Sequence, residues 1–268
     1  MSKSGKARVL TPEQFSHLMA VISQRRWPEK NTAIVQVSFK LGLRVQEIAL
    51  LQIKEIAELE FQGNRTTGFR VKDILALPAS YTKGARATNR STTPYHLRRI
   101  SMTIEDLDRK LRRVEEMARV GAEINLEDFH PPLSTRKGKS RDIPMQDEDL
   151  REVLTTYLNV RLDQDPSLKP SDPLFLSQKG GPYSPNTLQD HMALMIRRWA
   201  GVEKGSSHSG RRTLLTGIIH GEEKGVGLKA AQQVAGHANA ATTLIYQELP
   251  EWSIASALKR VGITYKSL

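Results

Sequence analysis

Apolar residues recur every three or four positions along most of this 268-residue chain, a spacing typical of amphipathic helices. Three helices are predicted in the first fifth of the sequence. One covers about 11–25 and opens on Thr11-Pro12, one covers about 29–40, and the third follows Gly42. We expect these three to pack as one helical layer, because the chain is long enough to bury a full core.

A β-rich pattern replaces the helical one between about residues 58 and 83, where Gly63 and Gly68 interrupt alternating apolar residues. This pattern predicts a twisted antiparallel hairpin, with Pro78 on an edge strand. Further short strands are predicted at the end of the basic segment 134–145 and at 174–176. The predicted fold class is therefore mainly α with a small antiparallel β-sheet (α+β).

One amphipathic helix is predicted after Thr103, with charged residues opposite an apolar stripe, and Gly121 ends it. The stripe consists of Ile104, Leu107, Leu111, Val114 and Ala118. Such a face can pack either on the rest of the domain or against another subunit. Later helices are predicted to start at Asp147, Ser184 and Ser207. Two more are predicted at 228–235 and 242–246, and a last amphipathic helix is predicted at 252–261.

The charge balance favours a polyanionic partner. Lys and Arg total 40 against 29 Asp and Glu, which gives a net charge of +11. There is no cysteine, so thiol chemistry and cysteine-ligated zinc are excluded. No signal-peptide core and no apolar run of membrane-spanning length is found, and a cytoplasmic, nucleoid-associated protein is expected. The basic segment 82–99 is interpreted as either a solvated loop or a DNA-backbone contact.

Three short patterns carry candidate chemistry. Arg44 and Glu47 lie three residues apart and share a helix face, and so do His208 and Arg211. The third pattern is Gly236-His237, with Tyr246 nine residues after the histidine. Taken singly, these are a surface ion pair, an ordinary surface or core histidine and a packing tyrosine. Their order in the chain favours a shared site.

Together the patterns resemble the catalytic domain of the tyrosine recombinase family. The matching boxes are Gly-Leu-Arg-x-x-Glu, His-x-x-Arg, and a Leu-Gly-His box with the nucleophilic tyrosine nine residues on. The resemblance covers about residues 11–55 and 134–262, and Ala235 stands where the family usually has leucine. The segments 141–145 and 173–177 also resemble connecting strands of that fold.

The resemblance implies a role for each matching residue. Arg44 and Arg211 clamp the scissile phosphate, and Glu47 orients the guanidinium of Arg44. His208 and His237 hydrogen-bond the same phosphate and help to move the tyrosine proton. Tyr246 attacks phosphorus and forms a 3′-phosphotyrosyl link. No metal and no other cofactor is implied.

The resemblance implies a general acid but leaves two candidates for it. The family places a lysine on the turn of a β-hairpin, and this chain departs from the usual spacing between Arg44 and that lysine. Lys83 and Lys137 are equal candidates, with Lys139 beside the second. We interpret about 85–134 as an insertion in the hairpin loop, so that Lys83 ends one strand and Lys137 and Lys139 begin the next. Contacts to the DNA backbone are expected from Arg86, Arg90, Lys139, Arg141 and Arg212.

The predicted organisation is a single catalytic domain over 1–268, since only about ten residues precede the first helix and no separate DNA-clamping domain is expected. The chain is then a minimal recombinase, a catalytic fragment, or a protein whose insertion supplies the DNA grip. Double-stranded DNA and a homo-oligomer, a tetrameric synapse, are the expected partners. The alternative functions are type IB topoisomerase-like relaxation and a catalytically silent DNA-binding regulator.

Overall fold

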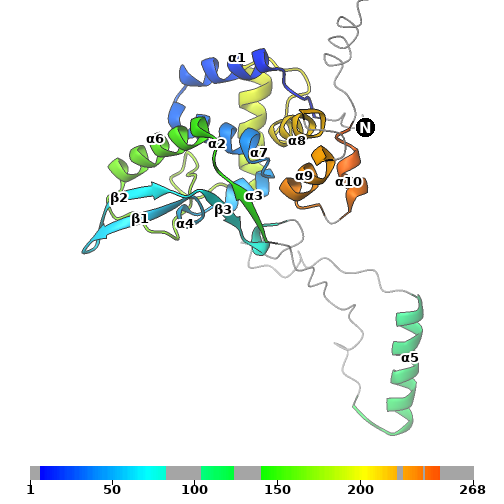
Figure 1. The fold of residues 1–268 in the computed structure, drawn as a ribbon. Coiled ribbons are helices and arrows are strands. Elements are labelled where there is room, and N and C mark those ends of the chain that lie inside the picture. The colour runs from blue at the N-terminus through cyan, green and yellow to red at the C-terminus, as the bar shows by residue number, and fades with distance from the viewer. Residues whose placement is uncertain (1–6, 83–103, 124–139, 222–225, 238, 248–268) are drawn as a thin grey trace, which may run out of the picture.

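The computed structural model describes residues 7–82, 104–123, 140–221, 226–237 and 239–247 (Figure 1). Its elements in chain order are α1 (Pro12–Ser23), α2 (Pro28–Lys40), α3 (Val45–Leu50), α4 (Ile53–Ile56), β1 (Ala57–Gln62), β2 (Arg65–Val71), β3 (Ile74–Leu77), the 3-10 turn η1 (Ala79–Tyr81), α5 (Ile104–Arg119), β4 (Arg141–Pro144), α6 (Glu148–Gln164), α7 (Pro185–Ala193), the π-helical η5 (Leu194–Trp199), α8 (Ser209–Gly221), α9 (Val226–Ala235) and α10 (Ala240–Leu244). The mainly helical α+β class predicted from the sequence is confirmed.

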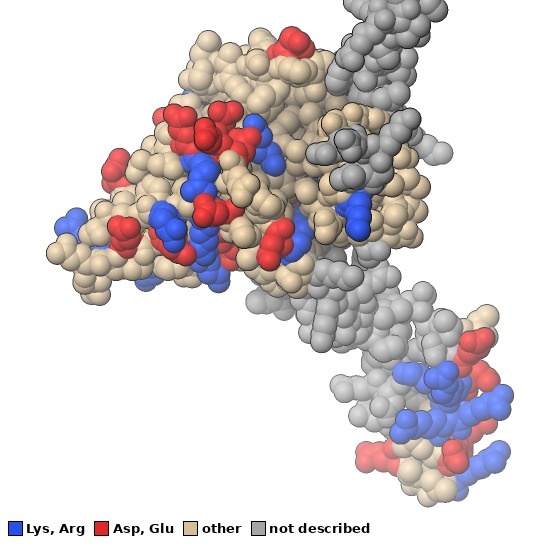
Figure 2. Space-filling model, viewed as in Figure 1, with Lys and Arg blue, Asp and Glu red and all other residues tan. Residues whose placement is uncertain are grey.

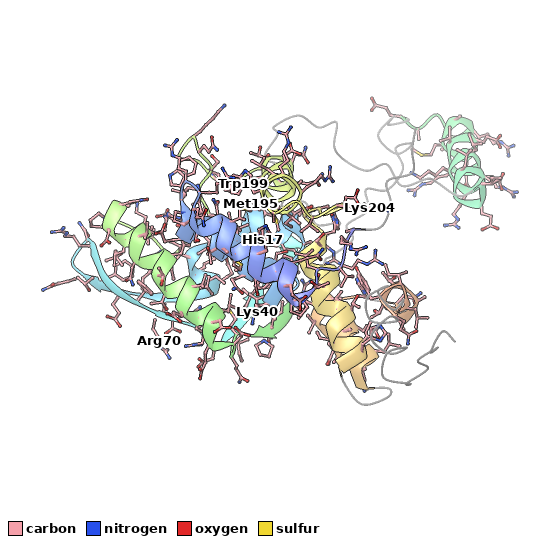
Figure 3. The ribbon with its side chains drawn as sticks, turned by 90° about the horizontal axis from the view of Figure 1, so that it is seen from above. His17, Lys40, Arg70, Met195, Trp199 and Lys204 are labelled. Atoms are coloured by element: carbon pink, nitrogen blue, oxygen red, sulfur yellow. The ribbon has the colours of Figure 1, made fainter. Side chains whose placement is uncertain are left out.

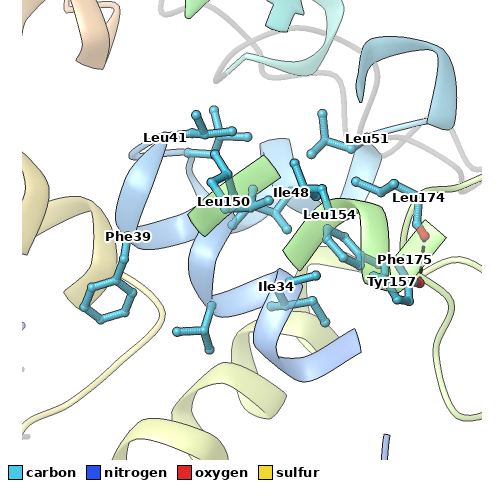
Figure 4. Close-up of a cluster of buried hydrophobic side chains, with 14 of the residues drawn as sticks. Ile34, Phe39, Leu41, Ile48, Leu51, Leu150, Leu154, Tyr157, Leu174 and Phe175 are labelled. Atoms are coloured by element: carbon cyan, nitrogen blue, oxygen red, sulfur yellow. Dashed lines mark hydrogen bonds between the residues drawn. The ribbon is translucent and has the colours of Figure 1, made fainter. Parts of the chain in front are cut away.

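The core forms around α2, which packs against α1, α3, α6 and α8. Figure 4 shows its centre, where Ile34 of α2 lies among Ile48 of α3 and Leu154 of α6. All three side chains are fully buried, and burying a side chain of this size contributes about 1.5–3 kcal/mol. The Tyr157 hydroxyl is buried with them and donates to the carbonyl of Leu174 at 2.8 Å.

Helix starts follow the capping residues seen in the sequence. Thr11 accepts from the backbone N–H of Gln14, whose side chain accepts from the backbone N–H of Thr11. Asp147 and Ser184 cap α6 and α7 by accepting from the backbone N–H of Leu150 and of Thr187. The predicted start of α8 is wrong. That helix begins at Ser209, after His208 rather than before it.

The strands form two separate two-stranded antiparallel sheets, β1 with β2 and β3 with β4. The predicted hairpin is confirmed as β1 and β2. In the second sheet Leu77 pairs with Arg141, so residues 64 positions apart meet at its end (141 − 77). The strand β3 stops at Leu77, because Pro78 has no N–H with which to extend the ladder, and so it does not continue to the end of the described residues at Thr82. Lys83, predicted to end this strand, lies outside the described residues.

The strand predicted at 174–176 is also wrong. Pro173 and Leu176 form only isolated bridges, to Gln52 and Pro182. Side chains occupy carbonyls that a strand would offer to a partner: Arg161 donates to Pro173 O at 2.8 Å and to Leu174 O at 2.7 Å. The apolar run is buried in the core instead of in a sheet.

Helix α7 continues into the π-helical η5, and α1 packs across this segment. In Figure 3, Met195 and Trp199 of η5 lie close to His17 of α1, while Arg70 and Lys40 mark β2 and the end of α2. Met195 is fully buried and Trp199 packs against the core. The predicted helix from Ser184 to about Trp199 is confirmed, with a wider final turn.

A smaller apolar cluster joins the C-terminal helices, where Leu215 of α8 packs on Ala231 and Ala235 of α9. Gly236 ends α9 as predicted, with φ +62°. Helix α5 stands away from the helical body (Figure 1). None of the described helices is long and apolar enough to cross a membrane. The predicted loop at 82–99 lies outside the described residues except for Thr82, and the predicted helix at 252–261 lies wholly outside them.

Candidate active site

Two arginines share one carboxylate at the junction of α3 and β4. Glu47 accepts from Arg44 Nη1 at 2.9 Å and from the Arg44 backbone N–H at 2.8 Å. Arg141 forms a two-pronged pair with the same group, Nη1 to Oε1 at 3.1 Å and Nη2 to Oε2 at 2.7 Å. The Glu47 side chain is 0% exposed and that of Arg141 only 8%, whereas that of Arg44 is 24% exposed. Arg44 therefore retains access to a ligand.

Glu47 is held as a carboxylate by its neighbours. Burial alone would raise its pKa, but the hydrogen bonds and charge of Arg141 and the charge of Arg44 lower the pKa below its ordinary value. A buried ion keeps its charge only when it is paired and hydrogen-bonded. Glu47 thus fixes the direction of both guanidiniums.

Arg211 lies in α8, buried between α2 and α9. Nη1 donates to the Gly42 carbonyl at 2.6 Å, and Nη2 donates to the Ala235 carbonyl at 2.7 Å and to His237 Nε2 at 3.1 Å. Burial first, and then the charge of Arg44, lower the pKa of Arg211 to about 10, which leaves it charged at neutral pH. Gly210 permits this approach, because a Cβ there would collide with Ser38 and Phe39 of α2.

The hydrogen bonds of His237 fix its tautomer. Arginine is only a donor, so Nε2 carries no proton where it meets Arg211, and Nδ1–H donates to Thr243 Oγ1 at 3.0 Å. Burial, and next the charges of Arg211, Arg44 and Arg141, lower the pKa of His237 to about 4. The imidazole is therefore neutral at neutral pH and presents a basic nitrogen to the site.

Tyr246 follows α10, and its ring stacks on that of His237 with centroids 6.0 Å apart and planes 17° apart. The side chain is half-buried and packs on the smaller apolar cluster. It also lies close enough to Arg211 for the charge of its phenolate form to raise the pKa of that arginine. The phenol is thus beside the guanidinium and imidazole and is not sealed in the core.

Other predicted site residues are placed less fully. His208 immediately precedes α8, three residues before Arg211, and its side chain is exposed, with Nδ1 3.3 Å from Ser207 Oγ. Arg212 is half-buried in α8. The remaining predicted residues lie outside the described part of the chain, namely Lys83, Lys137, Arg86, Arg90 and Lys139.

Two residues contribute to the site in ways that were not expected from the sequence. Arg141, expected as a phosphate contact on the surface, is buried against Glu47, and its Nη1 lies 2.9 Å from where a Cβ on Gly236 would be. Thr243, the partner of His237, is fully buried. The available signal was its position three residues before Tyr246, since the two residues share one face in the helix predicted at 242–246.

The arrangement is suited to an anion. Three guanidiniums against one carboxylate leave a net charge of +2 (3 − 1), with a neutral imidazole and a phenol beside them. A phosphodiester carries one negative charge, and a pentacoordinate transition state carries a second. A site with this charge stabilises the transition state more than the ground state.

The model of the phage integrase family matches residues 97–251, more than half of the chain. The chain belongs to the phage integrase family. The match includes α8 to α10, and therefore Arg211, His237 and Tyr246.

Curated relatives of this family member are tyrosine recombinases. Tyrosine recombinase XerC of Actinobacillus succinogenes is 28% identical over 249 residues, which are 90% of this chain and 77% of the relative. XerC of Actinobacillus pleuropneumoniae is 28% identical over 240 residues, which are 83% of this chain and 76% of the relative. The protein is accordingly a tyrosine-type site-specific DNA recombinase, and neither a topoisomerase nor a silent regulator is favoured.

Solved structures support the fold. The crystal structure of XerA recombinase is 19% identical with a TM-score of 0.58, covering 98% of this chain and 68% of that one. A Tn1549 transposon integrase in complex with circular intermediate DNA is 17% identical with a TM-score of 0.53, covering 98% and 70%. At these identities the likeness is one of fold, and it confirms the tyrosine recombinase catalytic-domain architecture.

Proposed function

We propose that Tyr246 is the nucleophile that cuts and rejoins a strand of double-stranded DNA, and that Arg44 and Arg211 bind the scissile phosphate. The observation that carries this proposal is the unbroken set of contacts from Arg211 to His237 and from His237 to the Tyr246 ring. It brings together a cation from α8, a base from the turn after α9 and a nucleophile from the turn after α10.

The chemistry is a transesterification. The Tyr246 oxygen forms a bond to phosphorus, the bond to the 5′ oxygen breaks, and the DNA 3′ end remains linked to the tyrosine. The reverse attack by a 5′-hydroxyl rejoins the strand without an external energy source. The leaving oxygen takes a proton from Lys83 or Lys137.

His237 takes part in this reaction as a neutral imidazole. Its Nε2 lies at the site without a proton. When a phosphate takes the place of Nε2 on Arg211, this nitrogen can accept the tyrosine proton. Thr243 is a positioning residue, because its hydroxyl holds Nδ1–H and so determines which nitrogen is basic. His208, at the exposed start of α8, is the second imidazole that reaches the phosphate.

Glu47 and Arg141 position Arg44 in this proposal. Arg141 donates to both oxygens of the Glu47 carboxylate, and its guanidinium also lies against Gly236. The pair therefore connects β4 to the turn that carries His237. Backbone phosphates are contacted by Arg86, Arg90, Lys139 and Arg212.

The residues about 85–134 are proposed as an insertion between β3 and β4 of a single catalytic domain. The antiparallel pairing of β3 with β4 supports this, because it gives the two strands a hairpin relation despite the long connection. We further propose that the protein works on DNA as a homo-oligomer, a tetrameric synapse, in the cytoplasm and at the nucleoid. Its similarity to tyrosine recombinase XerC and to an integrase in complex with DNA supports the action on DNA.

A suicide substrate, nicked so that the cleaved end cannot be rejoined, tests the assignment. The unaltered protein is expected to give a DNA-linked band on a denaturing gel, and Tyr246→Phe none, although both shift the same DNA on a native gel. Tyr157→Phe is the matched control, since that buried phenol lies in the core and not in the site. An undiminished band from Tyr246→Phe would overturn the proposal.

A further inference from the structure

Helix α5 stands apart from the other described elements (Figure 1), and it presents a largely exposed apolar stripe. Ile104 is 86% exposed, Leu107 46% and Leu111 47%. Exposed apolar side chains that line up on one face mark an interaction surface. The function proposed for the catalytic body makes no use of this helix.

The stripe has the spacing of a coiled coil. Numbered as a heptad, Ile104 and Leu111 occupy a positions, and Leu107 and Val114 occupy d positions, with Ala118 at the next a. In the sequence, the alternating spacing of three and four already includes Leu97 and Ile100, which lie outside the described residues. A seam of a and d residues packs best against another helix with the same repeat.

The charges of α5 argue against DNA as the occupant. The helix sequence has five acidic and five basic residues, so its net charge is zero (5 − 5). Figure 2 shows both signs intermixed on this helix. A surface that binds the DNA backbone needs an excess of positive charge, and α5 has none.

The charges beside the seam favour a second copy in parallel. Position g holds Lys110, and the following e position holds Glu115, so in a parallel pair Lys110 of each copy faces Glu115 of the other. The antiparallel alternative would set Asp108 against Glu115, two acids at e positions. Charge complementarity therefore selects both the partner and its orientation.

We propose that α5 is a self-association helix that pairs in parallel with α5 of a second copy of this chain. The seam would hold two protomers together through the insertion and away from the catalytic residues. The pairing does not depend on which residue cuts DNA, because it uses none of the active-site side chains.

Charge reversal in the full-length protein tests this proposal by sedimentation at increasing concentration. Lys110→Glu and Glu115→Lys are each expected to weaken self-association by at least tenfold. A one-to-one mixture of the two variants should associate again, because both interhelical pairs become opposite in sign. Glu116→Lys, on the outer f position, is the matched control and should associate like the unaltered chain.

Cross-linking tests the orientation. The chain has no cysteine, so a single introduced thiol reports one contact. Ile104→Cys should form a disulfide-linked dimer when oxidised glutathione takes up the two electrons, whereas Glu116→Cys should not. A monomer at every concentration without cross-link, or mixed variants that fail to associate, would overturn the proposal. So would equal cross-linking at both positions.

Discussion

The Arg44 half of the site (Arg44, Glu47 and Arg141) and the Tyr246 half (Arg211, His237, Thr243 and Tyr246) are held in different ways. The first lies on the main core and is fixed to a fully buried carboxylate by a bidentate contact from Arg141 and by the guanidinium and backbone N–H of Arg44. The second rests on the smaller cluster around Leu215, and its nucleophile follows a helix of five residues. The guanidiniums of Arg44 and Arg141 are thus anchored more firmly than the phenol of Tyr246.

This difference is useful for catalysis. Electrostatic stabilisation requires guanidiniums that do not reorganise when charge develops. A nucleophile must instead approach phosphorus and leave it again during one cycle. We therefore expect substitutions in the Arg44 half to reduce stability, and those in the Tyr246 half to reduce the rate.

The largest effect on stability is expected from Arg141→Ala. It leaves the buried Glu47 carboxylate with only Arg44 as partner, and breaking a buried pair costs about 3–5 kcal/mol. Urea unfolding of the DNA-free protein measures the free energy of unfolding. Arg70→Ala, which breaks an exposed pair with Glu58, is the control and should cost about 0–1 kcal/mol. Equal costs for the two variants would contradict the firm anchoring of the Arg44 half.

Arg211→Ala is expected to slow single-turnover cleavage by about 10²–10³-fold, because one preorganised donor set for the phosphate is lost. Arg211→Lys keeps the charge but cannot reach both the Gly42 and Ala235 carbonyls, so it should recover only part of the rate. Unfolding curves recorded alongside separate lost catalysis from lost structure. A cleavage rate that stays unchanged in Arg211→Ala would contradict the role of this half.

Gly236→Ala tests the contact between the halves. The left-handed backbone alone costs an alanine about 1–2 kcal/mol, and the new Cβ also meets Arg141. Gly201→Ala has the same backbone strain, at φ +65°, with nothing within 4 Å. Both variants should lose stability, but only Gly236→Ala should also lose cleavage activity. Loss of activity in both would show that the contact with Arg141 is immaterial.

The smallest effect is a pH dependence from His237. Its folded pKa of about 4 lies below the ordinary 6.5, so between these values the unfolded chain binds more protons. Stability contributed by this group is therefore complete above pH 6.5 and falls as the pH drops toward 4. His237→Gln should flatten this decline. Burial also lowers the pKa of His191 to about 4, so the stability of the variant should still decline somewhat between pH 6.5 and 4. An unaltered slope in the variant would contradict the neutral tautomer.

Local signals in the sequence were sufficient for most helices. Thr11, Asp147 and Ser184 cap the helices they were expected to cap, because the requirement for a side-chain acceptor is local. The segment 174–176 was misread as a strand because its carbonyls accept from side chains elsewhere in the sequence, that of Leu174 from Tyr157 and Arg161 and that of Leu176 from Lys30. Tertiary partners of this kind leave no periodic signal.

The same limit applies to the site. Arg44, Arg211, His237 and Tyr246 were identified from their spacing, and the structure brings them together around Glu47 and Thr243. The burial of Arg141 was not foreseen, since its partner lies 94 residues away and a basic turn is usually exposed. Only the pairing of β3 with β4 brings the two residues into contact.

The most direct test of the account is the location of the covalent bond. The adduct trapped on a suicide substrate would be digested with nuclease and protease, and the peptide carrying the residual nucleotide sequenced by mass spectrometry. We expect the phosphonucleotide on Tyr246 alone among the six tyrosines of the chain. A nucleotide attached to any other residue would contradict the convergence of the two halves on this phenol.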